Sequence, residues 1–400
     1  MRTLVAMLGP AFVAAVAYID PGNFATNVAS GARFGYALCW VVVLANLMAM
    51  LVQWLSAKLG VVTGHNLPEL CRTHLGRRWS AALWAQAEVV AMATDLAEFV
   101  GAAIALNLLF HVPLLAAGTI TAVVAFGILA LEQRGYRKFE LAIIALLFIV
   151  LLGFAYDFFR IGPSARGMAG GLVPSLPGHG AVVLAVGIIG ATVMPHVVYL
   201  HSALTQRRVP CADDAAKRRV LRFQRIDVVV AMTVAGLINL SMLFIAAALF
   251  NTTGHTGIDS IAAAHAGLAR LVGGGAALAF VLALLASGLS SSSVGTYAGQ
   301  IVMQGFIRRR IPVYLRRAIT MAPSLIVLGI GTAPTATLVV SQVVLSFGIP
   351  FALVPLVVLT RRADLMGPFV NRGLTTAVAS LVTAVVVGLN VMLLYTTFAG

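Results

Sequence analysis

The feature that most constrains this chain is a succession of long apolar segments separated by short polar ones. A bilayer core about 30 Å thick is crossed by a helix of roughly 20 apolar residues, at a rise of about 1.5 Å per residue. We therefore predict an all-α polytopic membrane protein with about 11 transmembrane helices. The predicted spans lie near residues 4–33, 36–59, 80–109, 113–131, 138–159, 180–206, 222–250, 271–307, 313–331, 335–360 and 373–398.

The composition agrees with a membrane protein and excludes an ordinary soluble enzyme or a disordered chain. Hydrophobic residues make up 60% of the 400 residues and charged residues only 10%, whereas soluble domains contain about 25% charged residues. The three cysteines, Cys39, Cys71 and Cys211, are far apart in the sequence and form no CxxC pair. This spacing argues against a disulfide framework or a thiolate metal site.

The positions of the basic residues predict how the spans are oriented. If the N-terminus is cytoplasmic, 23 of the 27 Lys and Arg residues fall on the cytoplasmic side, and only Arg33, Arg160, Arg166 and Arg270 fall outside. An excess of Lys and Arg marks cytoplasmic loops. We therefore expect a multi-pass protein of an inner (plasma) membrane, with a cytoplasmic N-terminus and an external C-terminus. The same bias explains the net charge of +14 without a nucleic-acid partner.

Two of the predicted spans are interrupted at membrane depth. Residues 20–23 (DPGN) interrupt the first span, and residues 190–196 (GATVMPH) interrupt the sixth. A proline in a membrane helix commonly produces only a kink, whereas an unwound segment is tolerated only where protein or a water-filled cavity surrounds it. The two breaks are five spans apart, as in an inverted repeat whose broken helices surround a substrate site near the midplane. We predict one transmembrane domain over residues 1–400, with a first repeat near 1–160, a second near 178–362 and an extra span near 373–398.

The residues at the two breaks predict a metal site. Asp20 is an ionisable group at bilayer depth, where such groups are costly and commonly functional. Asn23 adds an amide oxygen, Met194 adds a thioether sulfur, and unwinding frees the carbonyls of Ala17 and Ala191. Mg²⁺ and Ca²⁺ prefer oxygen ligands, whereas Mn²⁺ and Fe²⁺ also accept sulfur. A methionine in a span can equally be a packing residue, so Met194 alone does not decide between the two interpretations.

The third span carries Glu88, Asp95 and Glu98 and no basic residue. Glu88 and Asp95 fall on nearly one helix face, and Glu98 lies roughly 60° from Asp95. Three carboxyl groups along one helix, about 15 Å from first to last, are typical of a proton route. The alternative is a set of ion pairs with arginines of other spans. Arg316 and Arg317, at the start of the ninth span, are candidate partners, or simple cytoplasmic anchors.

Other polar residues at membrane depth have two interpretations each. His196 follows the second break, and it is a candidate proton acceptor because imidazole exchanges protons near neutral pH. Gln342 in the tenth span could reach the metal site or form a helix–helix hydrogen bond, and Asn239 is a further polar group near mid-span. The serines of residues 287–293 are most simply a small-residue packing face; the alternative is the wall of a sodium site.

Three segments closely resemble signature segments of the Nramp family of proton-coupled divalent metal importers, which includes the bacterial manganese transporters. They are residues 20–27 (DPGNFATN), 92–99 (MATDLAEF) and 194–202 (MPHVVYLHS). The resemblance covers essentially the whole chain and its eleven-span layout. It implies the LeuT-type inverted repeat, formed by spans 1–5 and 6–10 with broken helices 1 and 6.

The resemblance also implies roles for individual residues. Relatives that carry magnesium or aluminium depart from the position of Met194, so its presence here implies a transition-metal substrate. The implied metal ligands are Asp20, Asn23, Met194 and the carbonyls of Ala17 and Ala191, with Gln342 joining in some states. The residues implied in proton handling are Asp20, Glu88, Asp95 and Glu98, with His196, Arg316 and Arg317 nearby.

We therefore expect a secondary transporter, not an enzyme, that imports Mn²⁺ and Fe²⁺ with protons by alternating access in a bacterial inner membrane. Its partners are then the divalent metal ion, protons and the lipid bilayer, and no permanently bound cofactor is expected. A sodium-coupled amino-acid transporter of the same architecture is the alternative, although Asp20 and Met194 fit it poorly. A membrane metalloenzyme would need a closed ligand set such as HExxH, which the sequence lacks.

Overall fold

The computed structural model describes residues 9–133, 136–254, 258, 260–308, 312–331 and 333–398. All regular secondary structure in this part of the chain is helical. The helices, in chain order, are α2 (Pro10–Ala17), α3 (Pro21–Phe34), α4 (Cys39–Thr63), α5 (Leu67–Phe110), α6 (Leu114–Gln133), α7 (Tyr136–Ile161), α8 (Ala165–Gly170), α9 (His179–Thr192), α10 (Pro195–Thr205), α11 (Asp214–Ala246), η1 (Ala247–Asn251), α12 (Ile261–Leu271), α13 (Gly274–Ile307), α14 (Val313–Gly329), α15 (Pro334–Thr360), α16 (Ala363–Met366), η2 (Gly367–Phe369) and α17 (Gly373–Phe398).

Each of the eleven predicted spans corresponds to a helix or to a broken helix pair. The first span is the pair α2 and α3, and the sixth is the pair α9 and α10. Within the described residues, eight helical runs are long and apolar enough to cross a membrane, with α9 and α10 taken as one run. Shorter apolar helices lie within α6 and α14, and the pair α2–α3 completes the set. The prediction of an all-α polytopic protein is confirmed.

The third helix starts earlier than the apolar pattern predicts. Asn66 caps α5, because its side chain accepts a hydrogen bond from the Glu69 N–H at 3.0 Å while the Glu69 carboxylate accepts one from the Asn66 N–H at 3.0 Å. This reciprocal capping box stabilises a helix start that hydropathy does not reveal. The helix then bends at Gly76, whose φ of 77° is open to glycine at little cost. The short helix α12, capped by Ser260, was also not predicted.

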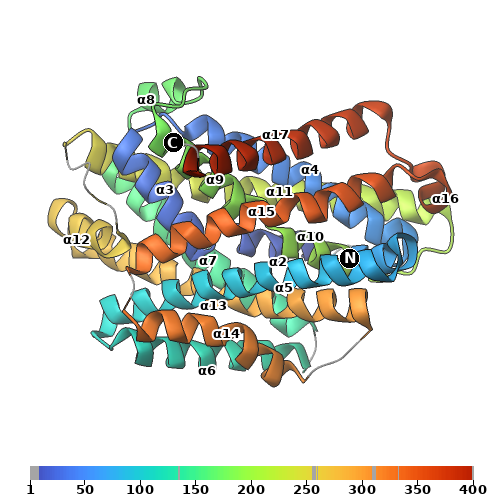
Figure 1. Cartoon of the computed structure of the whole chain (residues 1–400). Coiled ribbons are helices and arrows are strands. Elements are labelled where there is room, and N and C mark those ends of the chain that lie inside the picture. Colours follow the sequence, from blue (N-terminus) through green and yellow to red (C-terminus); the bar gives the residue numbers. More distant parts are fainter. Residues whose placement is uncertain are drawn as a thin grey trace.

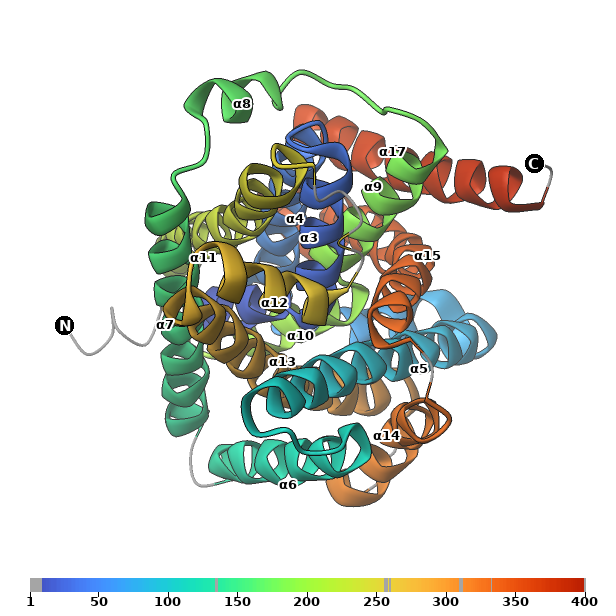
Figure 2. The ribbon, with the colours of Figure 1, turned by 90° about the vertical axis from the view of Figure 1, so that its left-hand side faces the viewer.

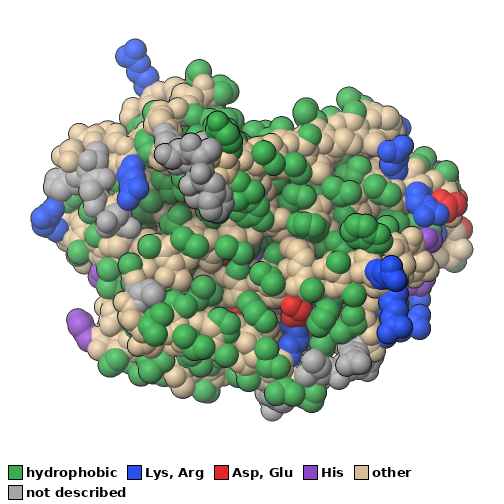
Figure 3. Space-filling view, viewed as in Figure 1, with side chains coloured by type: hydrophobic (Ala, Val, Ile, Leu, Met, Phe, Trp, Pro, Cys, Tyr) green, Lys and Arg blue, Asp and Glu red, His purple; other side chains and the backbone are tan. Residues whose placement is uncertain are grey.

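The long helices run roughly parallel to one another, with α8 and α12 at one end of the bundle and α16 at the other (Figure 1). Viewed along the bundle, α3 and α10 lie in its interior, and α6, α7 and α17 lie at its periphery (Figure 2). Hydrophobic side chains cover the middle of the face seen in Figure 3, and Lys and Arg side chains gather toward the end that carries α16. This face is therefore apolar across its middle, and the interior of the bundle holds segments of both broken helices.

Candidate metal site and carboxyl row

The same local device opens both broken helices. An α-helical carbonyl accepts a hydrogen bond from the N–H four residues later, and proline has no N–H to donate. Pro21 stands four residues after Ala17, and Pro195 stands four residues after Ala191. Helix α2 ends at Ala17 and α3 begins at Pro21, while α9 ends at Thr192 and α10 begins at Pro195. The sequence therefore releases one carbonyl in each break for another partner.

Ligand groups from the two breaks converge on the Asn23 side chain. Asp20 is the N-cap of α3, and its Oδ1 accepts hydrogen bonds from the Asn23 N–H at 2.8 Å and the Asn23 Nδ2 at 2.9 Å. The same Nδ2 donates to the Ala191 carbonyl at 3.1 Å. The carboxylate of one break and the free carbonyl of the other thus lie within hydrogen-bond distance of one atom, in a fully buried site.

Gln342 completes a third side of the site. Its Nε2 donates to the second carboxylate oxygen of Asp20 at 3.3 Å. Helix α15 reaches the breaks because glycines face it: a Cβ at Gly22 would lie 1.8 Å from the Gln342 Nε2, and one at Gly190 would lie 2.1 Å from the Gln342 carbonyl oxygen. This geometry agrees with both interpretations of Gln342, because the contact lies at the site and is itself a hydrogen bond between α15 and the N-cap of α3.

Met194 and Ala17 belong to the same two breaks and are fully buried. Met194 is the N-cap residue of α10, and its side chain makes no capping hydrogen bond. The predicted set therefore offers a carboxylate, an amide that can turn its oxygen inward, two carbonyls and a thioether. A metal held here would be cargo rather than a resident cofactor. In the described part of the chain, no three His, Cys, Asp or Glu side chains are grouped to hold a metal, and this set contains only one such residue.

Side chains of neighbouring helices satisfy the other carbonyls that the first break releases. Asn239 Nδ2 of α11 donates to the Tyr18 carbonyl at 2.8 Å, and the Ser287 hydroxyl of α13 donates to the Ile19 carbonyl. Asn239 also accepts a hydrogen bond from Asn27 Nδ2 at 3.0 Å. These two caps give Asn239 and Ser287 a structural role, and they orient the backbone that leads into Asp20.

Asp227, a residue that the sequence pattern does not single out, holds the other end of α2. Its carboxylate is buried and accepts hydrogen bonds from the backbone N–H groups of Gly9, at 3.0 and 3.1 Å, and Ala11, at 2.9 Å. A carboxylate at a helix N-terminus satisfies orphan donors and interacts favourably with the helix dipole. The available signal was one aspartate inside the apolar seventh span.

The predicted carboxyl row begins with an ion pair. Glu88 Oε2 lies 2.9 Å from Arg316 Nη2, and Trp84 Nε1 donates to the other Glu88 oxygen at 3.1 Å. Arg316 packs against Gly299, where a Cβ would lie 1.8 Å from its guanidinium. The ion-pair interpretation is therefore confirmed for Glu88 and Arg316. Arg317 lies in α14, but its side chain falls outside the described residues.

The rest of the row is buried along the same face of α5. Asp95 is 4% exposed and Glu98 is fully buried, and a Cβ at Gly295 would lie 3.2 Å from the Glu98 carboxylate. His196 approaches this helix from the second break, with its Nδ1 3.4 Å from the Thr94 hydroxyl. The structure thus brings the predicted proton residues of α5 alongside the second break.

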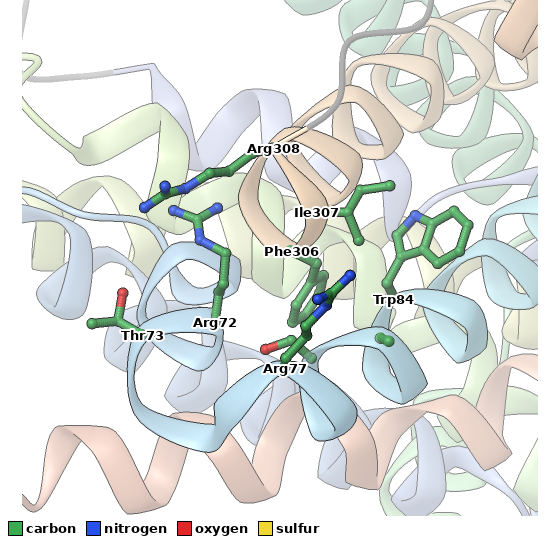
Figure 4. Close-up of a pocket in the computed structure, with 9 residues that line it drawn as sticks. Arg72, Thr73, Arg77, Trp84, Phe306, Ile307 and Arg308 are labelled. Carbon is green, nitrogen blue, oxygen red and sulfur yellow. The ribbon is translucent and has the colours of Figure 1, made fainter.

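A cavity of about 750 Å³ lies at the Glu88 end of the row, between the start of α5 and the end of α13 (Figure 4). Trp84, which donates to Glu88, lines it together with Phe306 and Arg77. Arg72 points toward Arg308 in Figure 4 and donates to the Gly305 carbonyl at the end of α13. The cavity therefore offers water a position one side chain away from Glu88.

Two broken helices that bring a carboxylate, an amide and a freed carbonyl together at a buried point are the arrangement of transporters with the LeuT-type fold. Residues 11–396 match the family described as Natural resistance-associated macrophage protein-like. The chain belongs to this family, Nramp, and it is a transporter rather than an enzyme.

Relatives and solved structures agree with this assignment over nearly the whole chain. A protein of Bacillus subtilis (strain 168) named Divalent metal cation transporter MntH is 50% identical over 398 residues, 99% of this chain and 93% of that protein. The crystal structure of the Eremococcus coleocola manganese transporter in complex with an aromatic bis-isothiourea substituted compound has a TM-score of 0.88 and 34% identity, covering 98% of this chain and 86% of that one. MhsT in complex with L-phenylalanine shares the fold, with a TM-score of 0.59 and 13% identity over 96% of this chain and 98% of that one.

Proposed function

We propose that this protein imports divalent transition-metal ions, Mn²⁺ and also Fe²⁺, by proton-coupled alternating access. One observation carries the proposal: Asn23 Nδ2 contacts both the Asp20 carboxylate and the Ala191 carbonyl, so oxygen ligands of both broken helices meet at one point. If the Asn23 amide rotated, its Oδ1 would replace its Nδ2 between the Asp20 carboxylate and the Ala191 carbonyl, where it could bind a metal ion. The names of the relatives, a divalent metal cation transporter and a manganese transporter, support the same substrate class.

Met194 supports the choice among divalent ions. A thioether adds little to the binding of Mg²⁺ or Ca²⁺, which prefer oxygen, whereas Mn²⁺ and Fe²⁺ accept mixed oxygen and sulfur ligands. Asp20 also weighs against an amino-acid substrate, because its carboxylate at the centre of the site would repel a substrate carboxylate. The sodium-coupled amino-acid carrier is therefore not favoured.

The arrangement of α5 supports coupling to protons. Glu98, Asp95 and Glu88 follow one helix from the region of the second break to the cavity beside Trp84, and Arg316 pairs with the last of them. We propose that protons pass along this row, with His196 at its inner end. An inside-negative potential would favour import, by about 2.3 kcal/mol per charge per 100 mV.

The distribution of basic residues supports an orientation. We propose that the end of the bundle carrying α16, where Lys and Arg gather, faces the cytoplasm of a bacterial cell (Figure 3). The N-terminus is then cytoplasmic and the C-terminus external. The cavity beside Trp84, lined by Arg72, Arg77 and Arg308, then opens to the cytoplasm.

The first test is Mn²⁺ uptake into proteoliposomes in sodium-free buffer, with and without an inward proton gradient, at a fixed membrane potential. We expect saturable uptake that the gradient accelerates and that acidifies the lumen. No uptake by protein shown to be folded would overturn the substrate assignment. Saturable uptake that is the same with and without the gradient would contradict proton coupling and leave the substrate assignment in place.

The coupling can be tested separately with Glu88→Gln. This change leaves the buried Arg316 without its carboxylate partner, and we expect the acceleration by the gradient to fall about tenfold or more while gradient-free uptake changes less. The matched control is Asp364→Asn, which removes the carboxylate of the exposed pair between Asp364 and Arg362. Equal losses in both variants would contradict a proton role for Glu88.

A further inference from the structure

A second cavity, of about 510 Å³, lies between α4, α11 and the start of α17. Segment 361–372, which joins α15 to α17, forms its remaining wall. None of its described lining residues belongs to the two breaks or to the carboxyl row of α5. Its basic lining residues are Lys58, Arg218, Arg222, Arg225 and Arg372.

Five cationic side chains line this cavity, and no acidic partner for them is found among the described residues. No carboxylate is among its described lining residues, and none of the five side chains takes part in the ion pairs of the described structure. Three of them contact aromatic rings or an amide instead. Arg225 lies 4.7 Å above the centre of the Trp54 ring, and Arg218 lies 5.8 Å above that of the Phe369 ring. Lys58 Nζ donates a hydrogen bond to Asn371 Oδ1 at 2.7 Å.

Such an arrangement favours a multivalent oxyanion. Like charges that line one cavity repel one another, and the repulsion is weaker at the exposed Arg218, Arg222, Arg225 and Arg372 than at the buried Lys58. Lys58 is only 8% exposed, and Arg225 lines the same cavity. Guanidinium groups match phosphate oxygens with two parallel hydrogen bonds each, and a lysine ammonium adds a point charge. A phosphate group would satisfy several of these donors at once.

The surroundings of the cavity favour a lipid as the source of that phosphate. Exposed apolar side chains continue from the cavity along α17, at Leu374 and Val378, and along α11, at Ile226 and Val229. Trp54 adds an aromatic ring of the kind that gathers at the membrane interface. Figure 1 places the start of α17 beside α16, the end of the bundle where basic side chains gather in Figure 3.

We propose that this cavity binds the phosphate of an anionic phospholipid, whose acyl chains lie on the exposed apolar faces of α11 and α17. Anionic lipids attract basic clusters next to membrane helices. The bound lipid would join α4, α11 and segment 361–372. Two of these helices also hold the first broken helix, because Gln53 of α4 donates to the Tyr18 hydroxyl and Asp227 of α11 caps α2.

The test uses the full chain in detergent, with dioleoylphosphatidylglycerol, dioleoylphosphatidylcholine or inorganic phosphate as the probe. Binding is measured by native mass spectrometry, and the melting temperature is measured alongside it. The test variant is Arg218→Gln with Arg222→Gln. The matched control is Arg219→Gln with Arg361→Gln, which removes the same charge from exposed positions that do not line the cavity.

Phosphatidylglycerol is expected to bind the unchanged protein more tightly than phosphatidylcholine and to raise its melting temperature. The test variant should bind phosphatidylglycerol about thirtyfold more weakly, and the control should bind it as the unchanged protein does. An equal loss in the control would mean unspecific surface attraction and overturn the proposal. Inorganic phosphate that competes fully with the lipid would assign the site to free phosphate instead. Should the test variant fail to fold, equal binding of the two lipids by the unchanged protein would still overturn it.

Discussion

The two broken helices meet at one site, but the surrounding structure holds them in different ways. Around the first break, polar side chains of three other helices bind the released backbone and the carboxylate: Asn239, Ser287 and Gln342. Around the second break, only Val193 and Met194 separate α9 from α10, and the Val193 N–H bonds to the Ile189 carbonyl at 2.8 Å within its own helix.

This difference divides the properties of the site between the two breaks. The first break supplies the charge, in Asp20, within a set of hydrogen bonds from α11, α13 and α15. The second supplies a carbonyl and a sulfur atom in an almost wholly buried setting. We expect the first break to determine affinity and the second to determine selectivity, in keeping with transporters that rock one part of the fold around a fixed site.

The largest effect is expected from Asp20→Asn. The change keeps the shape of the side chain and removes the only charge of the site, so we expect Mn²⁺ uptake to fall about a hundredfold or more, equivalent to about 2.7 kcal/mol. Asp157→Asn, which changes another fully buried carboxylate in α7, is the matched control. If Asp20→Asn takes up Mn²⁺ within a few-fold of the unchanged protein, the charge of Asp20 does not determine the affinity for Mn²⁺. The first break would then not determine affinity either.

Two glycine variants compare the packing of α15 against the two breaks. Gly190→Ala would place a Cβ 2.1 Å from a backbone oxygen of Gln342, whereas Gly22→Ala would place one 1.8 Å from the end of its side chain. A backbone clash requires a helix shift, and a side chain can rotate away. We therefore expect Gly190→Ala to lower the melting temperature and to reduce uptake about tenfold, by about 1.4 kcal/mol. Gly22→Ala should leave the melting temperature closer to that of the unchanged protein.

Gly127→Ala serves as a control for both, because a Cβ there meets nothing within 4 Å. If Gly22→Ala destabilises the protein more than Gly190→Ala, the Gln342 side chain does not rotate away from a Cβ at Gly22. That result would contradict the expected difference between the two contacts of α15.

The parts of this site that could be predicted from the sequence are those determined within a single helix. Pro21 and Pro195 interrupt apolar runs, and each removes a hydrogen bond from its own helix, so the breaks and the freed carbonyls of Ala17 and Ala191 follow from the sequence. The convergence of Asp20, Asn23 and Ala191 agrees with the predicted ligand set. Their role in metal binding stays a prediction.

The parts that could not be predicted depend on contacts between distant helices. Asp227 is one aspartate in an apolar span, and only the packing of α11 against α2 places it at the α2 N-terminus. The choice between ion pairing and anchoring for Arg316 was likewise open until the contact between α14 and α5 was known. Periodicity within one helix carries no information about which neighbour it meets.

The smallest effect on Mn²⁺ uptake is expected at the second break, from Met194→Leu and Met194→Ala. Both remove the sulfur, and leucine keeps most of the buried volume. Because the oxygen ligands remain, we expect Mn²⁺ uptake to fall about tenfold or less, by about 1.4 kcal/mol, while uptake of Ca²⁺ or Mg²⁺ appears. Competition by these ions against Mn²⁺ uptake measures the change. The leucine variant removes the sulfur and keeps most of the volume, so it tests the sulfur alone. If Met194→Leu still excludes Ca²⁺ and Mg²⁺, the sulfur does not determine selectivity. Selectivity would then have to come from the oxygen ligands that the two breaks share.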